Sequence, residues 1–240
     1  MKKLSVAMSL AAAVAAPSVF ADSLGYKPGQ WVVRAGATQV EPREDSDDIK
    51  LNGSVLMLGG GLLTPGQSSS VGINSDTQLG LTVEYMLTEN WGVELLAAKP
   101  FEHTASGKGY IQGLDVADFK HLPPTLSAVY HFSPLGALQP YVGAGINYTF
   151  IYDEELTPEA EATFASLGLN NGKMKLDDSI GVALQAGVDY HVDEHWLVNA
   201  SVRWIDIDTE AKIQFSSGDK LTTDIEVDPM VYTLSVGYKF

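Results

Sequence analysis

Eight segments of the chain place apolar residues at every second position, with small or polar residues between them. This period of two is that of a β-strand with one apolar face. The clearest example is the last segment, Met230–Phe240, whose apolar side is rich in aromatic residues. The other seven are Gln30–Val40, Thr77–Leu87, Trp91–Phe101, His121–Phe132, Gln139–Phe150, Ser179–Val192 and Trp196–Asp208. Such lengths suit strands that cross a membrane at a tilt, which takes about 9–11 residues.

The connections between these segments alternate in length. Short turns follow the second, fourth and sixth segments. Long connections follow the first, third, fifth and seventh: Glu41–Asp76, Glu102–Lys120, Ile151–Asp178 and Thr209–Asp228. Aromatic residues gather near both ends of the segments, where membrane interfaces would lie. The pattern predicts an all-β fold: an eight-stranded antiparallel transmembrane β-barrel with long outer loops and short periplasmic turns.

The two ends of the predicted barrel carry their own signals. In a closed barrel the last strand pairs with the first, and an aromatic end lies at the lipid–water interface. We therefore expect Tyr238 and Phe240 to mark closure and assembly of the barrel. Pro123 and Pro124 weaken the start of the fourth strand, because neither residue has a backbone N–H to donate.

The first residues are typical of a secretory signal peptide. Lys2 and Lys3 precede an apolar run, and Val19-Phe20-Ala21 places small residues before a cleavage point. This predicts removal of residues 1–21 and a mature barrel of residues 22–240 in the outer membrane. The chain has no Cys, so disulfides and thiol chemistry are excluded. Its formal net charge of −15 argues against a nucleic-acid partner.

One short helix is predicted within the third long connection. Thr157 has the N-cap residue type, Pro158 suits the first helical position, and Gly168 follows the last turn. We expect this helix to lie against the barrel mouth. A loosely ordered acidic loop is the alternative.

The inward face of the predicted barrel mixes charged and apolar residues. Its charged members are Arg34, Glu84, Glu94, Asp189 and Arg203, and they form either an internal ion-pair network or a polar pore. Its apolar members are Leu96, Val129, Leu197, Ile205 and Ile207. Because inward glycines at 143, 145, 181 and 187 leave room beside them, a lumen of this composition is expected to admit a thin apolar molecule.

The first long connection contains an apolar stretch that would be unfavourable in bare contact with water. Its members are Leu56, Met57, Leu58, Leu62 and Leu63. They form either an entrance surface for apolar solutes or an extra strand turn packed on its neighbours.

Few residues of the sequence suggest a catalytic or metal-binding site. Glu41–Asp48 and the pair Asp206 and Asp208 are acidic, but neither has the spacing of a calcium loop. His191 and His195 straddle a predicted turn, which does not suit a helical metal pair. The chain lacks the Gly-x-Ser-x-Gly and phosphate-loop motifs. We therefore predict no catalytic residues, no metal site and no cofactor.

Several short motifs, in order along the chain, resemble those of the outer membrane protein W family. They are TQLGLT at Thr77–Thr82, VELLAA at Val93–Ala98, LPPTL at Leu122–Leu126, PYVGAGINYT at Pro140–Thr149, WLVN at Trp196–Asn199, DIDT at Asp206–Thr209 and the ending GYKF at Gly237–Phe240. The resemblance covers essentially the whole of residues 22–240.

The resemblance implies an outer-membrane barrel of Gram-negative bacteria that takes part in uptake of small hydrophobic solutes and in stress responses. It also implies contact with outer-membrane lipid and lipopolysaccharide, sideways passage of solute from barrel to membrane, and for some members a receptor role for bacteriocins or phage. By the same resemblance Leu96 narrows the lumen, whereas Arg203 stands where a relative would have an aromatic residue.

Our leading hypothesis is a barrel that admits small, mainly apolar molecules, with Leu96 and Arg203 as gate. Replacing Leu96 by Ala is then expected to speed uptake of an apolar solute. Three alternatives remain: a sealed structural or interaction barrel acting through its acidic loops, an outer-membrane enzyme, and a soluble lipocalin-type barrel with its apolar face inward.

Overall fold

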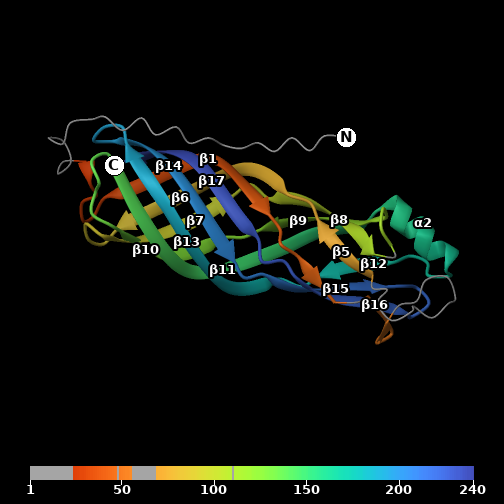
Figure 1. Ribbon diagram of the computed structural model, residues 1–240. Coiled ribbons are helices and arrows are strands. Elements are labelled where there is room, and N and C mark those ends of the chain that lie inside the picture. The colour runs from red at the N-terminus through yellow and green to blue at the C-terminus, as the bar shows by residue number, and fades with distance from the viewer. Residues whose placement is uncertain (1–23, 48, 56–68, 110) are drawn as a thin grey trace.

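Eight strands close into one antiparallel barrel in the computed structural model, which describes residues 24–47, 49–55, 69–109 and 111–240 (Figure 1). The strands are β1 (Trp31–Glu41), β6 (Asp76–Met86), β7 (Trp91–Ala98), β10 (Thr125–His131), β11 (Leu138–Leu156), β13 (Ser179–His191), β14 (Trp196–Ile205) and β17 (Met230–Lys239). β1 pairs with β6 and with the last strand, β17, and the β10–β11 pairing completes the ring. The predicted fold class is confirmed.

The outer surface of this barrel is apolar. Outward side chains such as Leu79, Leu126, Ile146 and Ile180 are exposed. At the short-turn end the exposed apolar surface continues with the aromatic residues Trp31, Trp91, Trp196 and Phe240. An apolar surface of this extent is unfavourable in water and favourable in hydrocarbon, so it forms the lipid-facing wall. Within the described ranges, no helix is long and apolar enough to cross a membrane.

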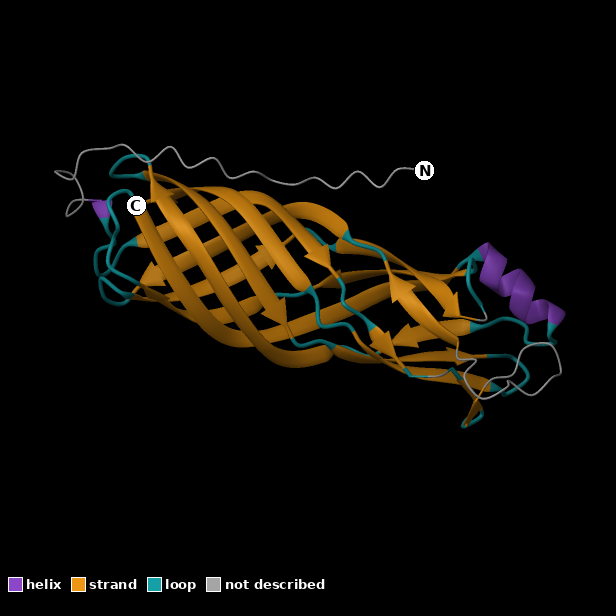
Figure 2. Cartoon of the chain, viewed as in Figure 1, coloured by secondary structure: helices purple, strands orange, loops and turns teal. Residues whose placement is uncertain are grey.

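The long connections are not the loops that the sequence predicts. They contain β2 (Asp45–Ser46), β3 (Lys50–Leu51), β4 (Ser54–Val55), β5 (Ser69–Ile73), β8 (Phe101–Gly109), β9 (Asp115–Leu122), β12 (Lys173–Leu176), β15 (Asp208–Gln214) and β16 (Lys220–Glu226). Figure 2 shows these strands prolonging the barrel beyond its membrane part. We call this prolongation the outer section and the eight-stranded part the membrane section.

Three predicted strands are shorter than expected. The third ends at Ala98, before Lys99 and Pro100, and the fourth begins at Thr125, after Pro123 and Pro124. Proline cannot donate to the strand ladder, which explains both breaks. The seventh ends at Ile205, and Asp208 already belongs to β15.

The direction of the alternation reverses between the two sections. In the membrane section apolar side chains point outward and polar ones inward. In the outer section β8 instead buries Phe101, His103 and Ala105 and exposes Glu102, while β15 buries Ala211 and exposes Asp208. The outer section therefore has the apolar interior and polar surface of a soluble barrel, which fits strands that stand in water.

The predicted helix is confirmed as α2 (Pro158–Ser166), near the far end of the outer section (Figure 1). The Thr157 Oγ1 atom accepts a hydrogen bond of 3.1 Å from the Ala160 backbone N–H, as an N-cap residue does. Phe164 packs edge-on against Phe215, with 5.5 Å between ring centroids. The helix thereby covers the outer end of the apolar interior.

Candidate functional site: an apolar cavity above a filled lumen

A network of buried charges fills the membrane section. Arg34 Nη1 lies 2.8 Å from Glu84 Oε2, and Arg34 Nη2 lies 2.9 Å from Asp189 Oδ2. These three side chains are at most 2% exposed. His131 Nε2 lies 2.7 Å from the other Glu84 oxygen. The network is internally paired, as buried charges must be if they are not to destabilise the fold strongly.

A second ion pair lies further toward the outer section. Arg203 Nη2 is 2.7 Å from Glu94 Oε1, and Gln185 contacts both partners. Among the described residues, the buried Asp, Glu, Lys and Arg side chains are Arg34, Arg203, Lys239, Glu84, Glu94 and Asp189, so cations and carboxylates are equal in number. This agrees with the expected ion-pair network and not with an open polar pore.

Little space remains among these charges. The cavity between Arg34, Glu94, Leu96 and Arg203 has a volume of about 10 Å³, roughly what one water needs. The inward glycines do not widen it, because a Cβ atom at Gly187 would overlap the Tyr141 ring and one at Gly143 would overlap Gln185. At these two glycines the room that was expected for a solute is taken by side chains, and at Gly145 and Gly181 a Cβ atom would overlap backbone oxygens.

The short-turn end of the lumen is also occupied. The Tyr26 hydroxyl donates to Asp189 Oδ2 at 2.5 Å, and Lys239 Nζ donates to the Leu24 carbonyl oxygen at 2.7 Å. Leu197 packs there with Tyr26, Val32 and Met86. The chain segment before β1 therefore plugs this end of the barrel.

An apolar layer separates the charges from the outer section. It consists of Val40, Phe101, Ala183, Ile205, Ile207 and Val231. Above it lies a cavity of about 90 Å³, several times the volume that one water needs. Strands β8, β9, β15 and β16 contribute to its walls, with Ala105, Phe119, Ala211 and Ile225 among the lining residues, and Phe164 of α2 lines it from the far end. A cavity walled in this way favours an apolar occupant.

Two histidines line this cavity. His103 and His121 are 3% and 6% exposed, and their rings stack with 4.8 Å between centroids. Burial, together with the neighbouring His103, lowers the pKa of His121 to about 3. Burial also lowers the pKa of His103. Both rings are therefore neutral at pH 7.

The barrel wall contains an unpaired seam just below these histidines. β10 pairs with β7 as far as Thr125↔Leu96, and β9 resumes pairing with β8 at Phe101↔His121. Between these points the described chain shows no ladder joining residues 97–100 to residues 122–124. Three of those residues are prolines, which have no N–H with which to close it.

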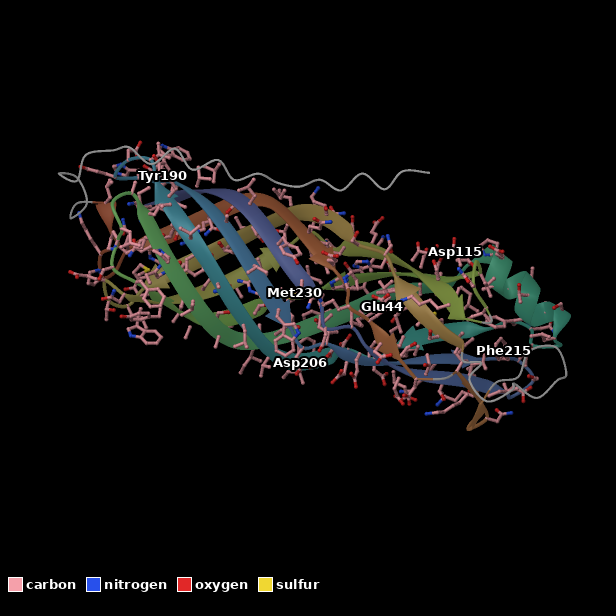
Figure 3. The ribbon with its side chains drawn as sticks, viewed as in Figure 1. Glu44, Asp115, Tyr190, Asp206, Phe215 and Met230 are labelled. Atoms are coloured by element: carbon pink, nitrogen blue, oxygen red, sulfur yellow. The ribbon has the colours of Figure 1, made fainter. Side chains whose placement is uncertain are left out.

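Three carboxylates meet at the junction of the two sections, near the labelled Asp206 and Met230 in Figure 3. Asp206, Asp208 and Asp228 each place an oxygen within 4.8 Å of the others. Asp206 and Asp208 are near each other in the sequence, whereas Asp228 comes from the other end of the β15–β16 hairpin and cannot be linked to them from the sequence alone. Acidic groups at such a boundary are common without an ion, and we assign none.

The predicted site residues fall into different places. Leu96 and Arg203 line the narrow lumen, Val129 is fully buried there, and Ile205 belongs to the apolar layer above it. The apolar stretch Leu56, Met57, Leu58, Leu62 and Leu63 lies outside the described residues. β17 pairs with β1, and the Tyr238 ring packs against Trp196 and Phe240. The assembly role of Tyr238 and Phe240 stays a prediction.

Sequence reasoning missed the cavity itself. Its walls come from segments that their length predicts to be loops, although these segments have their own period of two. In Thr209–Ile213 the apolar positions alternate with Glu210 and Lys212, and in Leu221–Ile225 with Thr222 and Asp224. That alternation was the available signal.

Comparison with known proteins agrees with this architecture. The sequence profile of the OmpW family matches residues 27–240. Outer membrane protein W of Vibrio cholerae is 38% identical over 243 residues, covering 100% of both chains. The crystal structure of the outer membrane protein OprG from Pseudomonas aeruginosa superposes with a TM-score of 0.77 at 42% identity, covering 90% of this chain and 98% of that one. A more distant relative, 24% identical with 88% of each chain covered, is a dibenzothiophene metabolism operon protein of Pseudomonas aeruginosa.

Proposed function

This chain belongs to the OmpW family of outer-membrane barrels, and from that membership and the geometry of its interior we propose that it admits small, mainly apolar molecules through the outer membrane. The name of one relative points the same way, since dibenzothiophene is an apolar aromatic compound. We propose further that no covalent chemistry is involved.

One observation supports this proposal above the others: the apolar cavity lies directly over a lumen filled by paired charges. A molecule that enters the outer section meets apolar walls, and burial of its apolar surface favours binding by about 25 cal/mol per Å². Continuing straight on would require it to disrupt the ion pairs of Arg34 and Arg203. Removing one partner of a buried pair costs about 3–5 kcal/mol.

We propose that the solute leaves sideways through the seam between residues 97–100 and 122–124. Opening the wall at this place breaks no backbone ladder, because the prolines there offer no N–H. The neighbouring outward side chains Leu79, Tyr148 and Phe150 are exposed and apolar. The solute would therefore pass from the cavity to lipid without crossing water.

The test is paired measurement of ion conductance and solute uptake on the same refolded protein. In a planar bilayer we expect no discrete ion-conducting openings. In vesicles with lipopolysaccharide in the outer leaflet we expect faster uptake of an apolar fluorophore than in vesicles without protein. Uptake no faster than in empty vesicles would overturn the proposal and favour a sealed interaction barrel.

Leu96 gives a second test. Its side chain lies at the inner end of the seam, where Leu96 pairs with Thr125. Replacing it by Ala enlarges the space between cavity and wall, so we expect uptake of an apolar solute to rise severalfold. The matched control is Leu95→Ala, because Leu95 points outward to lipid on the same strand and is 47% exposed. Equal effects of the two changes would remove Leu96 from the path.

A further inference from the structure

Among the described residues that line the apolar cavity, His103 has a buried ring nitrogen that lacks a hydrogen-bond partner. His103 Nδ1 lies 2.7 Å from the backbone oxygen of Asn74. A carbonyl oxygen only accepts hydrogen bonds, so Nδ1 must carry the proton. In a neutral ring the other nitrogen, Nε2, is then an acceptor with a free lone pair. Among the described residues this buried atom has no hydrogen-bond partner.

The geometry of Asn74 fixes that arrangement. Its side-chain oxygen accepts a hydrogen bond of 2.7 Å from the Thr104 backbone N–H, while its backbone oxygen faces His103. The ring of His103 also stacks on His121 and contacts Phe119, whose ring centroid is 5.6 Å away. The imidazole is therefore a positioned acceptor and not a freely rotating one.

Most of the threonine hydroxyls around the cavity already donate to other groups. Four of the five threonines that line it have hydroxyls that donate elsewhere: Thr149 to Asn147, Thr163 to Glu159, Thr209 to Asp177 and Thr223 to Asp47. The fifth, Thr222, is partly exposed to solvent. An unsatisfied buried acceptor is unfavourable, so the cavity favours an occupant that supplies a donor.

We propose that the cavity selects apolar molecules that carry a hydroxyl group, with phenols as the best fit, and that the hydroxyl donates to Nε2 of His103. Phe119, Phe164 and His121 offer aromatic surface for the ring of such a molecule. This inference rests on the proposed function, because it names the solute class of the same cavity. It assigns His103 a specificity role that its sequence context does not suggest.

The test compares para-cresol with para-xylene, which differ only in a hydroxyl and a methyl group. Binding is measured by equilibrium dialysis against the full chain in lipid nanodiscs, with empty nanodiscs subtracted. After partitioning into empty nanodiscs is subtracted, we expect the wild-type protein to bind para-cresol about 2- to 10-fold more tightly than para-xylene. This is the range expected from a single hydrogen bond between neutral groups.

The diagnostic variant is His103→Asn. Its amide can donate in place of Nδ1 toward Asn74, but it places no acceptor where Nε2 stood. We expect it to lose the preference for para-cresol and to keep its affinity for para-xylene, which also shows that the cavity has formed. Glu102→Gln, at the neighbouring outward position of β8, is the matched control and should keep the preference.

Each outcome decides between the proposals. Equal binding of both compounds to the wild type overturns the hydroxyl preference and leaves the apolar function standing. A preference that survives in His103→Asn overturns the role of His103. Binding of neither compound overturns the proposed function itself. If the variant does not fold, 4-methylanisole on the wild type replaces it: this ether cannot donate, so binding as tight as para-cresol contradicts the inference.

Discussion

The membrane section and the outer section of this barrel enclose opposite interiors. The first is filled by paired charges such as Arg34, Glu84 and Asp189, and its apolar side chains face lipid. The second encloses an apolar cavity, and its charged side chains face water. In each section the solvent outside decides which residues face inward, so one continuous barrel wall changes its inner chemistry where the membrane ends.

Stability and solute binding therefore depend on different sections of the barrel. The charged lumen resists passage and holds the strands together, whereas the apolar cavity leaves space for a solute. Changes in the membrane section should therefore affect mainly unfolding. Changes in the outer section should affect mainly binding and local opening.

The largest effect is expected from Arg34→Met. The change leaves Glu84 and Asp189 buried without their cation, so we expect a loss of about 3–5 kcal/mol in the free energy of unfolding. Urea unfolding in lipid vesicles, followed by tryptophan fluorescence, measures it. The control is Lys108→Ala, which removes a pair with Glu44 at 2.6 Å whose lysine is 52% exposed and should cost about 0–1 kcal/mol. Similar losses in both variants would refute the distinction between buried and exposed pairs.

Acidification should open the outer section first. The folded-state pKa of His121 is lowered to about 3, below the ordinary value of 6.5, so the unfolded hairpin binds protons more readily. Stability of the β8–β9 hairpin is therefore present above about pH 6.5 and declines as the pH falls toward 3, by up to about tenfold in its opening constant per pH unit.

Hydrogen-exchange protection of β8 and β9 amides, corrected for the intrinsic pH dependence, measures that opening. β14 of the membrane section serves as the internal reference. His121→Phe should flatten the pH dependence in β8 and β9. If His121→Phe keeps the full wild-type dependence of protection on pH, another titrating group must cause the opening.

Filling the cavity should abolish binding without unfolding the barrel. Ala105 is 6% exposed and lines the cavity, so Ala105→Phe places a ring in the solute space. We expect the affinity for para-xylene to fall about tenfold or more, which corresponds to about 1.4 kcal/mol. Glu102→Phe puts the same ring on the outward face of β8 and should leave binding unchanged. Unaltered binding by Ala105→Phe would place the solute elsewhere.

The smallest effect is expected at the acidic junction. Partial loss of hydration raises the pKa of the largely exposed Asp208, and the neighbouring carboxylates of Asp206 and Asp228 also raise it. The charged form is therefore disfavoured in the folded state, and its destabilising effect grows as the pH rises through the folded pKa. Asp208→Asn should slightly increase protection of the β15–β16 hairpin at pH 7 but not at pH 3. Glu210→Gln, which loses a contact with Lys212, should bring no gain.

The membrane section could be predicted well from the sequence, because each of its strands needs a continuous apolar face in contact with lipid. That requirement made segments such as Thr77–Leu87 and Ser179–Val192 recognisable from their period alone. The inward charges followed from the same alternation, and their pairing follows from the cost of leaving a buried charge alone.

The strands of the outer section could not be predicted in the same way, because they are short and place their apolar side chains inward instead of outward. The stacking of His103 on His121 depends on the register of the β8–β9 hairpin, where Phe101 pairs with His121 and His103 with Phe119. Residues 18 positions apart in the sequence meet only once that register is known. The free Nε2 of His103 depends in addition on Asn74, in a different connection.

The position of a bound apolar molecule would show which of the two sections receives the solute. Crystals of the full chain soaked with para-dibromobenzene allow anomalous scattering from bromine to locate it. The account predicts bromine peaks between β8, β9, β15 and β16, beside Ala105 and Phe119, with none among Arg34, Glu84 and Asp189. Peaks within the charged lumen would contradict the division of the barrel into a filled membrane section and a receptive outer section.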